Sequence, residues 1–153
     1  SSICMALIKN REEYFMNMAL KEAMKAYEED EIPVGAVIVY QDQIIGRGYN
    51  QSQRLKDSTA HAEMIAITSA QNKIGSKYLN GCELYVTLEP CMMCSGAIFL
   101  SKISKVVYGL DDKEKGFLRL SKEYTNKKLK IISKIKEIKS KELLDSFFFK
   151  LRS

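Results

Sequence analysis

Three side chains that bind zinc, and one that can move protons, are spaced along this chain in a pattern that favours metal-dependent hydrolysis. The sole histidine, His61, stands two residues before Glu63, and 26 residues separate that glutamate from Pro90-Cys91-Met92-Met93-Cys94. One imidazole and two thiolates occupy three positions of a tetrahedral zinc ion and leave the fourth for water. Because an open position is typical of catalytic zinc, we expect His61, Cys91 and Cys94 to be metal ligands.

Glu63 has a separate role in this scheme. Two thiolates and a neutral imidazole balance the charge of the zinc ion, so its water should be less acidic than at an all-histidine site, where the water pKa is about 7. A base is then needed to complete the deprotonation. A carboxylate that is not a ligand can take this proton, pass it to a ring nitrogen and protonate a departing amine. We therefore expect Glu63 to be the catalytic residue.

The cysteines are also compatible with two other kinds of site. An isolated C-x-x-C at the start of a helix also fits a thioredoxin-like redox pair, but the histidine and glutamate upstream favour a metal site. A purely structural zinc ion needs a fourth protein ligand, and Cys82 is the only candidate. Cys82 is expected at the far end of its strand, so the catalytic arrangement is preferred. Cys4 is not part of a metal-binding motif and is not expected to be a ligand.

The spacing of these residues dictates how the fold must present them. Cys91 and Cys94 are three residues apart, so at the start of a helix their Cβ atoms lie about 5–6 Å apart on one face. His61 and Glu63 are two apart, which separates side chains in mid-helix, so they must act at the opening turn of a helix. Two helix N-termini should therefore converge on one ion at the end of a sheet, where open α/β sheets bind ligands.

Hydrophobic periodicity and turn residues predict the elements that carry these groups. We expect strands at 34–40 and 44–49 joined by a hairpin, further strands at 82–88 and 105–109, and a lysine-rich edge strand at 129–135. The first helix is expected to begin at Asn10, which Glu13 helps to cap, and to end at the acidic run 28–31. Further helices are expected from Thr59 to Lys73, from Pro90, and from Ser140 to Leu151. This order predicts an α/β fold in which helices sandwich a mixed sheet.

Composition limits the class of protein further. The 153 residues are 46% hydrophobic, enough for one globular domain. The N-terminal stretch lacks a basic leader and no segment suits a membrane span, so cytoplasmic residence without a membrane partner is expected.

The net charge of +5 is unevenly distributed along the chain, because residues 119–153 hold 11 Lys/Arg against 4 Asp/Glu. This basic end, with a helix from about residue 138, fits an anionic partner such as nucleic acid, although a solvated helix face is the simpler alternative.

The longer strings around these motifs resemble one branch of the cytidine deaminase-like superfamily, the bacterial tRNA-specific adenosine deaminases. H-x-E with P-C-x-x-C marks the superfamily of zinc-dependent nucleobase deaminases. The branch is marked, from about Tyr14 to Gly116, by Pro33-Val34-Gly35-Ala36-Val37, Gly48-Tyr49-Asn50, Thr59-Ala60-His61-Ala62-Glu63, Leu84-Tyr85-Val86-Thr87-Leu88-Glu89-Pro90-Cys91-Met92-Met93-Cys94-Ser95-Gly96-Ala97 and Val106-Val107-Tyr108-Gly109.

The resemblance implies a function and an assembly. It implies a three-layer α/β/α sandwich with a mixed five-stranded sheet, one zinc-dependent nucleobase deaminase domain spanning 1–153, one Zn²⁺ per subunit and a homodimer. The implied reaction is deamination of adenosine to inosine at the wobble position of a tRNA anticodon stem-loop. Asn50 is implied to contact the flipped base, Asp112 the loop backbone, and Phe148 an aromatic position on the last helix, although Asn50 also suits a turn and the phenylalanines also suit a core.

Some segments depart from the family pattern. Gln51 follows Asn50 where many relatives have arginine, and Phe117-Leu118-Arg119-Leu120 replaces a stretch of small residues. These changes concern how an anticodon loop is held and leave the chemistry intact. Two alternative functions stay open: a deaminase of a free base or nucleotide such as guanine, cytosine or deoxycytidylate, and a catalytically silent, zinc-stabilised RNA-binding subunit.

Overall fold

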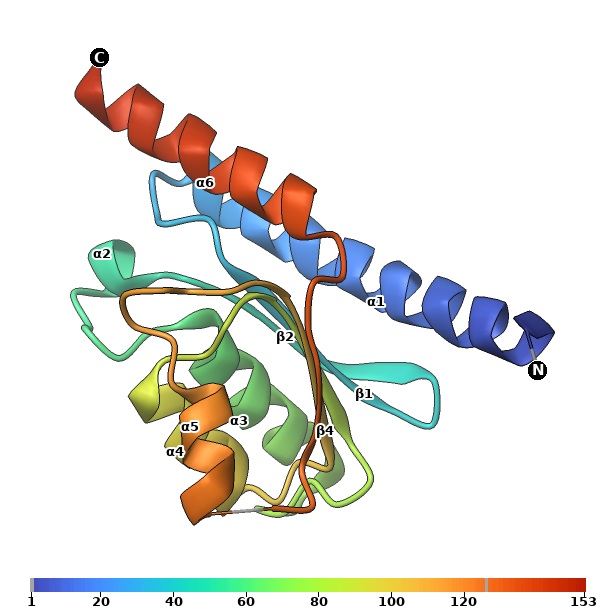
Figure 1. Ribbon diagram of the computed structural model, residues 1–153. Coiled ribbons are helices and arrows are strands. Elements are labelled where there is room, and N and C mark those ends of the chain that lie inside the picture. The colour runs from blue at the N-terminus through green and yellow to red at the C-terminus, as the bar shows by residue number, and fades with distance from the viewer. Residues whose placement is uncertain (1, 126) are drawn as a thin grey trace.

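A computed structural model describes residues 2–125 and 127–153 as a five-stranded mixed sheet with helices on both faces (Figure 1). The strand order is β2-β1-β3-β4-β5, with β1 antiparallel to β2 and β3, and with β3, β4 and β5 parallel. This confirms the expected α/β sandwich. The elements are α1 (Ser2–Glu28), β1 (Gly35–Tyr40), β2 (Gln43–Tyr49), α2 (Ser52–Leu55), α3 (Ala62–Ile74), β3 (Glu83–Leu88), α4 (Met92–Leu100), β4 (Lys105–Leu110), α5 (Leu118–Tyr124), β5 (Lys130–Ile132) and α6 (Glu137–Arg152).

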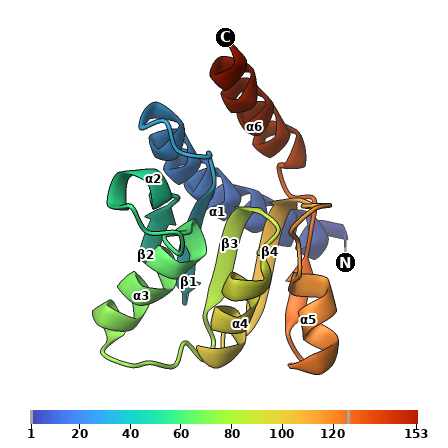
Figure 2. The same cartoon turned by 90° about the vertical axis from the view of Figure 1, so that its left-hand side faces the viewer.

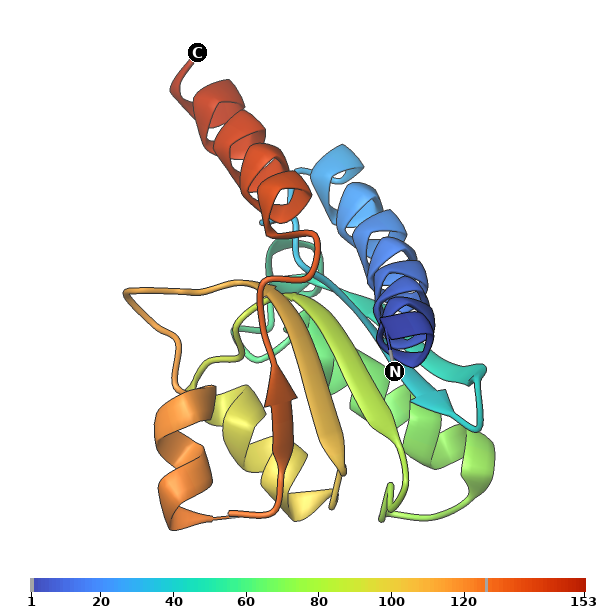
Figure 3. The same cartoon turned by 45° about the vertical axis from the view of Figure 1, so that its right-hand side comes forward.

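Helices cover the two faces of the sheet unequally. Helices α3, α4 and α5 lie on one face, and α1 lies across the other (Figure 2). Helix α6 follows the last strand and lies beside α1, with its C-terminal end extending beyond the sheet (Figure 3). The rings of Tyr27 in α1 and Phe147 in α6 meet edge to face, with 6.4 Å between their centroids. Helix α6 thus lies near the carboxyl ends of β3 and β4, close to the predicted ligand Cys91.

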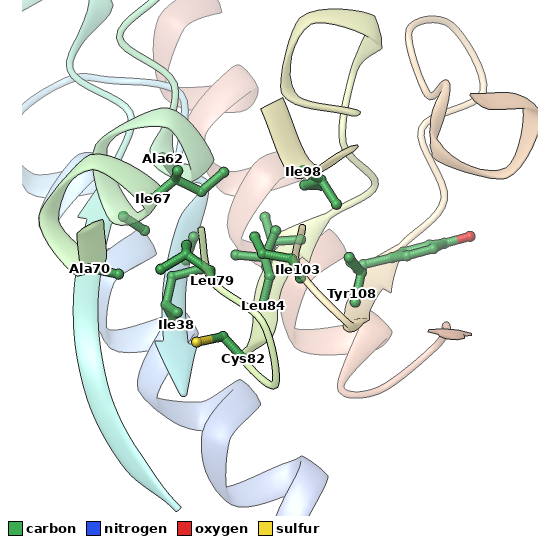
Figure 4. Packing of buried hydrophobic residues seen from close by; sticks show 14 of the residues in the cluster. Ile38, Ala62, Ile67, Ala70, Leu79, Cys82, Leu84, Ile98, Ile103 and Tyr108 are labelled. Atoms are coloured by element: carbon green, nitrogen blue, oxygen red, sulfur yellow. The ribbon is translucent and has the colours of Figure 1, made fainter. Parts of the chain in front are cut away.

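Alternating side chains of the central strands build two separate cores. Ile38, Leu84 and Val106 pack under α3 and α4, whereas Val37, Tyr85 and Val107 pack under α1. Figure 4 shows the first of these cores, in which Ala62 and Ile67 of α3 and Ile98 of α4 meet the sheet. Both faces of β1, β3 and β4 are thus buried, which is why their sequences are apolar runs rather than alternating patterns.

Glycines in β2 let α3 lie close against the sheet. A Cβ atom on Gly48 would lie 2.3 Å from the backbone oxygen of Ala62, and one on Gly46 would lie 2.4 Å from that of Ala66. Side chains are excluded at both positions because the helix backbone already fills the space. The start of α3, which carries His61 and Glu63, is positioned by this contact.

Several predicted helix boundaries were wrong. Helix α1 begins at Ser2, not at Asn10, because the preceding residues are helix formers with no breaker among them. Helix α3 begins at Ala62 rather than Thr59, since Asp57 accepts hydrogen bonds from the backbone N–H and hydroxyl of Thr59 and forms a turn there. The segment 50–58, for which no helix was predicted, contains the short helix α2. Helix α6 begins at Glu137 rather than Ser140.

The remaining expectations about the sheet were confirmed within a residue or two for four strands. Strand β5 is shorter than predicted, Lys130–Ile132, and lies at the sheet edge as its lysines indicated. Ser1, the first residue of the N-terminal stretch considered above, lies outside the described residues. Among the helices that the structure describes, none is long and apolar enough to cross a membrane.

Candidate metal centre and adjoining cavity

The predicted ligands come together where two helices begin. His61 is the N-cap of α3 and Cys91 is the N-cap of α4, and both have extended backbone conformations. Helix α4 therefore begins at Met92 and not at Pro90 as predicted, because Cys91 stays extended. Cys94 lies in the first turn of α4 and is fully buried. The two N-caps bring side chains 30 residues apart in sequence to one point at the carboxyl end of β3.

The distances within this group fit a tetrahedral zinc ion. His61 Nδ1 lies 3.6 Å from Cys91 Sγ and 3.6 Å from Cys94 Sγ, and all three ligand atoms lie within 4.8 Å of one another. Zn–S bonds of about 2.3 Å and Zn–N bonds of about 2.0–2.1 Å at a tetrahedral angle separate sulfur from nitrogen by about 3.6 Å. The donor set and its spacing thus match zinc with three protein ligands.

The electrostatics of the two thiols differ because one donates to the other. Hydrogen bonds from Cys94 and His61 lower the pKa of Cys91 to about 3. The same bond to Cys91, together with burial, raises the pKa of the Cys94 thiol. A divalent cation bound by both sulfurs would allow both thiols to ionise.

Glu63 lies beside the three donors in the first turn of α3. It is only 4% exposed, and burial raises its pKa to about 7. A carboxyl group whose pKa lies near neutrality can both accept and release a proton at physiological pH.

A cavity of about 410 Å³ opens over the group. His61, Cys91 and Glu63 line it, whereas Cys94 lies behind them in the core. The structure brings Asn50, Asp112 and Phe148 to the same cavity, from the end of β2, the loop after β4 and helix α6. A larger groove of about 640 Å³ between α1 and α6 contains none of these side chains.

The three outer residues differ in what they contact. Asn50 Oδ1 accepts a hydrogen bond of 2.8 Å from the backbone N–H of Ala62. Asp112 Oδ1 accepts bonds of 3.1 Å from the backbone N–H groups of Glu114 and Lys115, so its carboxylate stabilises its own loop. Phe148 is 39% exposed, while its neighbour Phe147 is buried against Tyr27. Phe148 is thus the member of the Phe147–Phe149 run that faces the cavity.

Residues that sequence reasoning did not single out also shape the cavity. Lys113 and Lys115 approach from the loop after β4, and Lys141 from α6. Lysines are frequent at this end of the chain and carry no local signal that separates these three from the others. Glu89 is buried directly before the Pro90-Cys91 motif. Its place beside a predicted zinc ligand is visible in the sequence, but its burial is not.

Comparison with known proteins agrees with this geometry. The model of the cytidine and deoxycytidylate deaminase zinc-binding region matches residues 9–110. The chain belongs to this family of zinc-dependent deaminases. The matched segment contains His61, Glu63, Cys91 and Cys94, the residues that meet below the cavity.

Similar proteins within the deaminase family carry more specific names. The chain is 48% identical over 146 residues to the tRNA-specific adenosine deaminase of Aquifex aeolicus, covering 92% of this chain and 96% of that protein. It is 41% identical over 147 residues to the protein of the same name from Bacillus subtilis, covering 93% and 91%. A solved structure from a study of A-to-I editing by tRNA:A34 deaminases superposes with a TM-score of 0.80 at 39% identity, covering 86% and 99%.

Proposed function

We propose that this deaminase converts adenosine to inosine at the wobble position of a tRNA anticodon stem-loop. The observation that carries the proposal is a buried Glu63 that lies beside the His61/Cys91/Cys94 donor set, without being part of it, at the floor of a cavity. The relatives named tRNA-specific adenosine deaminase, which match over more than nine-tenths of the chain, support adenosine in RNA as the substrate.

The residues of this chain divide the reaction between them. Zinc bound by His61, Cys91 and Cys94 would lower the pKa of a water molecule, which once deprotonated can attack C6 of adenine. Glu63 accepts the proton of that water, transfers it to N1, and delivers a second proton to the departing amine, so that water and adenosine yield inosine and ammonia. Burial of Glu63 supports this role because it holds the pKa near neutrality.

The outer residues are proposed to hold the RNA. Asn50 donates from its amide NH₂ to the flipped base, Phe148 stacks on a base, and Asp112 contacts the loop backbone. The lysines at the cavity mouth, Lys113, Lys115 and Lys141, support binding of a phosphate backbone. The +7 charge of residues 119–153 supplies further attraction at long range.

Assembly and metal content belong to the same proposal. We propose one zinc ion per subunit of a homodimer in the cytoplasm, with residues 1–153 acting as one deaminase domain. Met92 and Leu100 of α4 and Leu120 of α5 are each more than half exposed, which supports a partner subunit on this side. Elemental analysis and sedimentation equilibrium measure the stoichiometry of metal and subunits.

The decisive experiment compares substrates. Zinc-loaded protein is incubated with an anticodon stem-loop containing a wobble adenosine, and inosine is measured beside ammonia release from guanine, cytosine and deoxycytidylate. We expect inosine in the stem-loop and none with Glu63→Ala. Turnover of free bases or nucleotides alone would replace the proposal with the first alternative, and binding of the stem-loop without inosine would favour the silent RNA-binding subunit.

A further inference from the structure

Glu89 and Arg119 form an ion pair directly beside the metal centre that the chemistry above does not use. Glu89 ends the segment before Pro90-Cys91, and its side chain is 2% exposed. Arg119 lies in α5, with Arg119 Nη2 3.4 Å from Glu89 Oε1 and Arg119 Nε 3.5 Å from Glu89 Oε2. A buried carboxylate that lacks a cation lowers the stability of the fold. The contact with Arg119 therefore stabilises Glu89 in its buried position.

The Glu89 carboxylate also holds the loop at 111–116. Glu89 Oε1 accepts a hydrogen bond of 3.2 Å from the backbone N–H of Asp112. At the other end of the loop, a Cβ atom on Gly116 would lie 2.5 Å from the same oxygen, so the loop passes directly over the carboxylate. One side chain thus touches both ends of a six-residue segment.

Backbone hydrogen bonds tie the same loop to the residues before Cys91. Glu89 N–H donates to Leu110 O at 2.8 Å, and Phe117 N–H donates to Pro90 O at 3.0 Å. The loop therefore begins and ends on two consecutive residues that precede a predicted zinc ligand. A shift of the loop would be transmitted to Cys91 through very few bonds.

Asp111 makes further contacts that hold the start of the loop. Its carboxylate accepts a bond of 2.7 Å from Tyr108 Oη and lies 3.9 Å from Arg119 Nη2. Arg119 consequently bridges two acids, one at the end of β3 and one after β4. It belongs to the Phe117-Leu118-Arg119-Leu120 stretch, in which this chain departs from the family pattern that it resembles.

The loop held in this way is a wall of the substrate cavity. Its residues 111–115 all line the cavity, as Asn50 and Phe148 do. We propose that Glu89, with Arg119, is a positioning residue that sets the 111–116 loop against the cavity and thereby determines how the RNA is held. The inference rests on the proposed function for its substrate, and on the contacts above for the positioning itself.

Amide hydrogen exchange tests the positioning without any substrate. In Glu89→Ala and in Arg119→Met, backbone amides at 112–117 should exchange about tenfold faster or more. Glu89→Ala removes the acceptor of the Asp112 N–H bond, and Arg119→Met removes the cation that holds this acceptor in place. Glu89→Gln retains an acceptor for Asp112 N–H and should fall between these and the wild type. Arg119 is 60% exposed at its side chain, so Arg119→Met leaves the core intact even where Glu89→Ala fails to fold.

A second buried ion pair provides the matched control. Glu12 and Lys105 meet at 2.9 Å with side chains only 5% and 12% exposed, at the opposite end of β4. Glu12→Gln removes a comparable contact far from the cavity. It should lower stability without changing exchange at 112–117. Exchange in the loop that is unchanged in Arg119→Met, or equally faster in Glu12→Gln, would overturn the inference.

Kinetics on the anticodon stem-loop separate positioning from a general loss of structure. Arg119→Met and Glu89→Gln should raise KM more than they lower kcat, with zinc content as in the wild type, because the loop holds RNA and carries no reacting group. An equal loss of kcat and of zinc would assign Glu89 to the metal centre instead. If the wild type fails to deaminate the stem-loop, the proposed function fails, and the exchange measurements still decide the positioning.

Discussion

The side-chain oxygen of Asn50 accepts a hydrogen bond of 2.8 Å from the backbone N–H of Ala62, the first residue of α3. The contact joins the end of β2 to the helix that begins at His61. It satisfies one of the N–H groups that a helix start leaves without a partner inside the helix. It also fixes the orientation of the amide, so that its NH₂ group is the part left to donate to a substrate.

Substitutions at Asn50 should separate these two roles. Asn50→Asp keeps an acceptor for Ala62 but removes the NH₂ donor, so thermal stability should change little while deamination of the stem-loop falls. Asn50→Ala removes both the acceptor and the donor. Loss of the hydrogen bond to Ala62 at the start of α3 should lower the free energy of unfolding by about 1 kcal/mol in addition. Thermal unfolding and initial rates measure the two effects. Full activity in Asn50→Asp would exclude the NH₂ group from substrate binding.

Glu63→Gln should abolish turnover while leaving the metal bound. The amide has nearly the size of the buried carboxyl group but cannot accept and release protons, so kcat should fall by about 10²–10⁴-fold. Elemental analysis should find as much zinc as in the wild type, since Glu63 is not among the three donors that meet. Loss of zinc in this variant would make Glu63 a ligand and contradict the proposed mechanism.

Cysteine substitutions distinguish a ligand from a buried thiol. Cys91→Ser should lose zinc, because a thiolate ligand is missing, and chelators should then leave its melting temperature nearly unchanged. Cys82→Ser is the matched control. Cys82 is buried before β3, at the opposite end of this strand from Cys91, and should keep its zinc with only a modest loss of stability. Zinc loss in Cys82→Ser would favour a structural site with four protein ligands.

Gly48→Ala should displace the helix that carries His61. The added methyl group has no room, since a Cβ there would lie 2.3 Å from the backbone oxygen of Ala62, and overpacking of this kind costs about 1–3 kcal/mol. Gly96→Ala in α4 is the control, because nothing described lies within 4 Å of its Cβ position and alanine favours the helix. Gly48→Ala should have a lower free energy of unfolding in denaturant and should retain less zinc than the wild type. Gly96→Ala should show neither effect.

Adjacent phenylalanines test the base-stacking role. Phe148→Ala should weaken binding of the stem-loop, because loss of a stacked ring costs about 1–3 kcal/mol per base. Phe149→Ala should not, since Phe149 is 72% exposed and lies outside the cavity. KM for the stem-loop at a fixed salt concentration compares the two. Equal effects would indicate a general contribution of α6 rather than a specific contact.

Several features could be predicted from the sequence because they depend on residue type and local period. The apolar runs of β1, β3 and β4 indicated strands, and the lysines of β5 indicated an edge. Helix ends were less predictable. Asn10 suits a cap, yet favourable residues before it extend α1, and Thr59 suits a helix start, yet Asp57 holds it in a turn.

The sequence by itself determined the donor set and the chemistry, because a histidine, a glutamate and two cysteines at these spacings leave few alternatives for a zinc ion and a base. Only the tertiary structure decided how that chemistry is enclosed. The bond from Ala62 to Asn50, the turn of Phe148 toward the cavity and the hold of Glu89 on the 111–116 loop join residues from different elements. Such contacts follow from packing in three dimensions, and no local period in the chain encodes them.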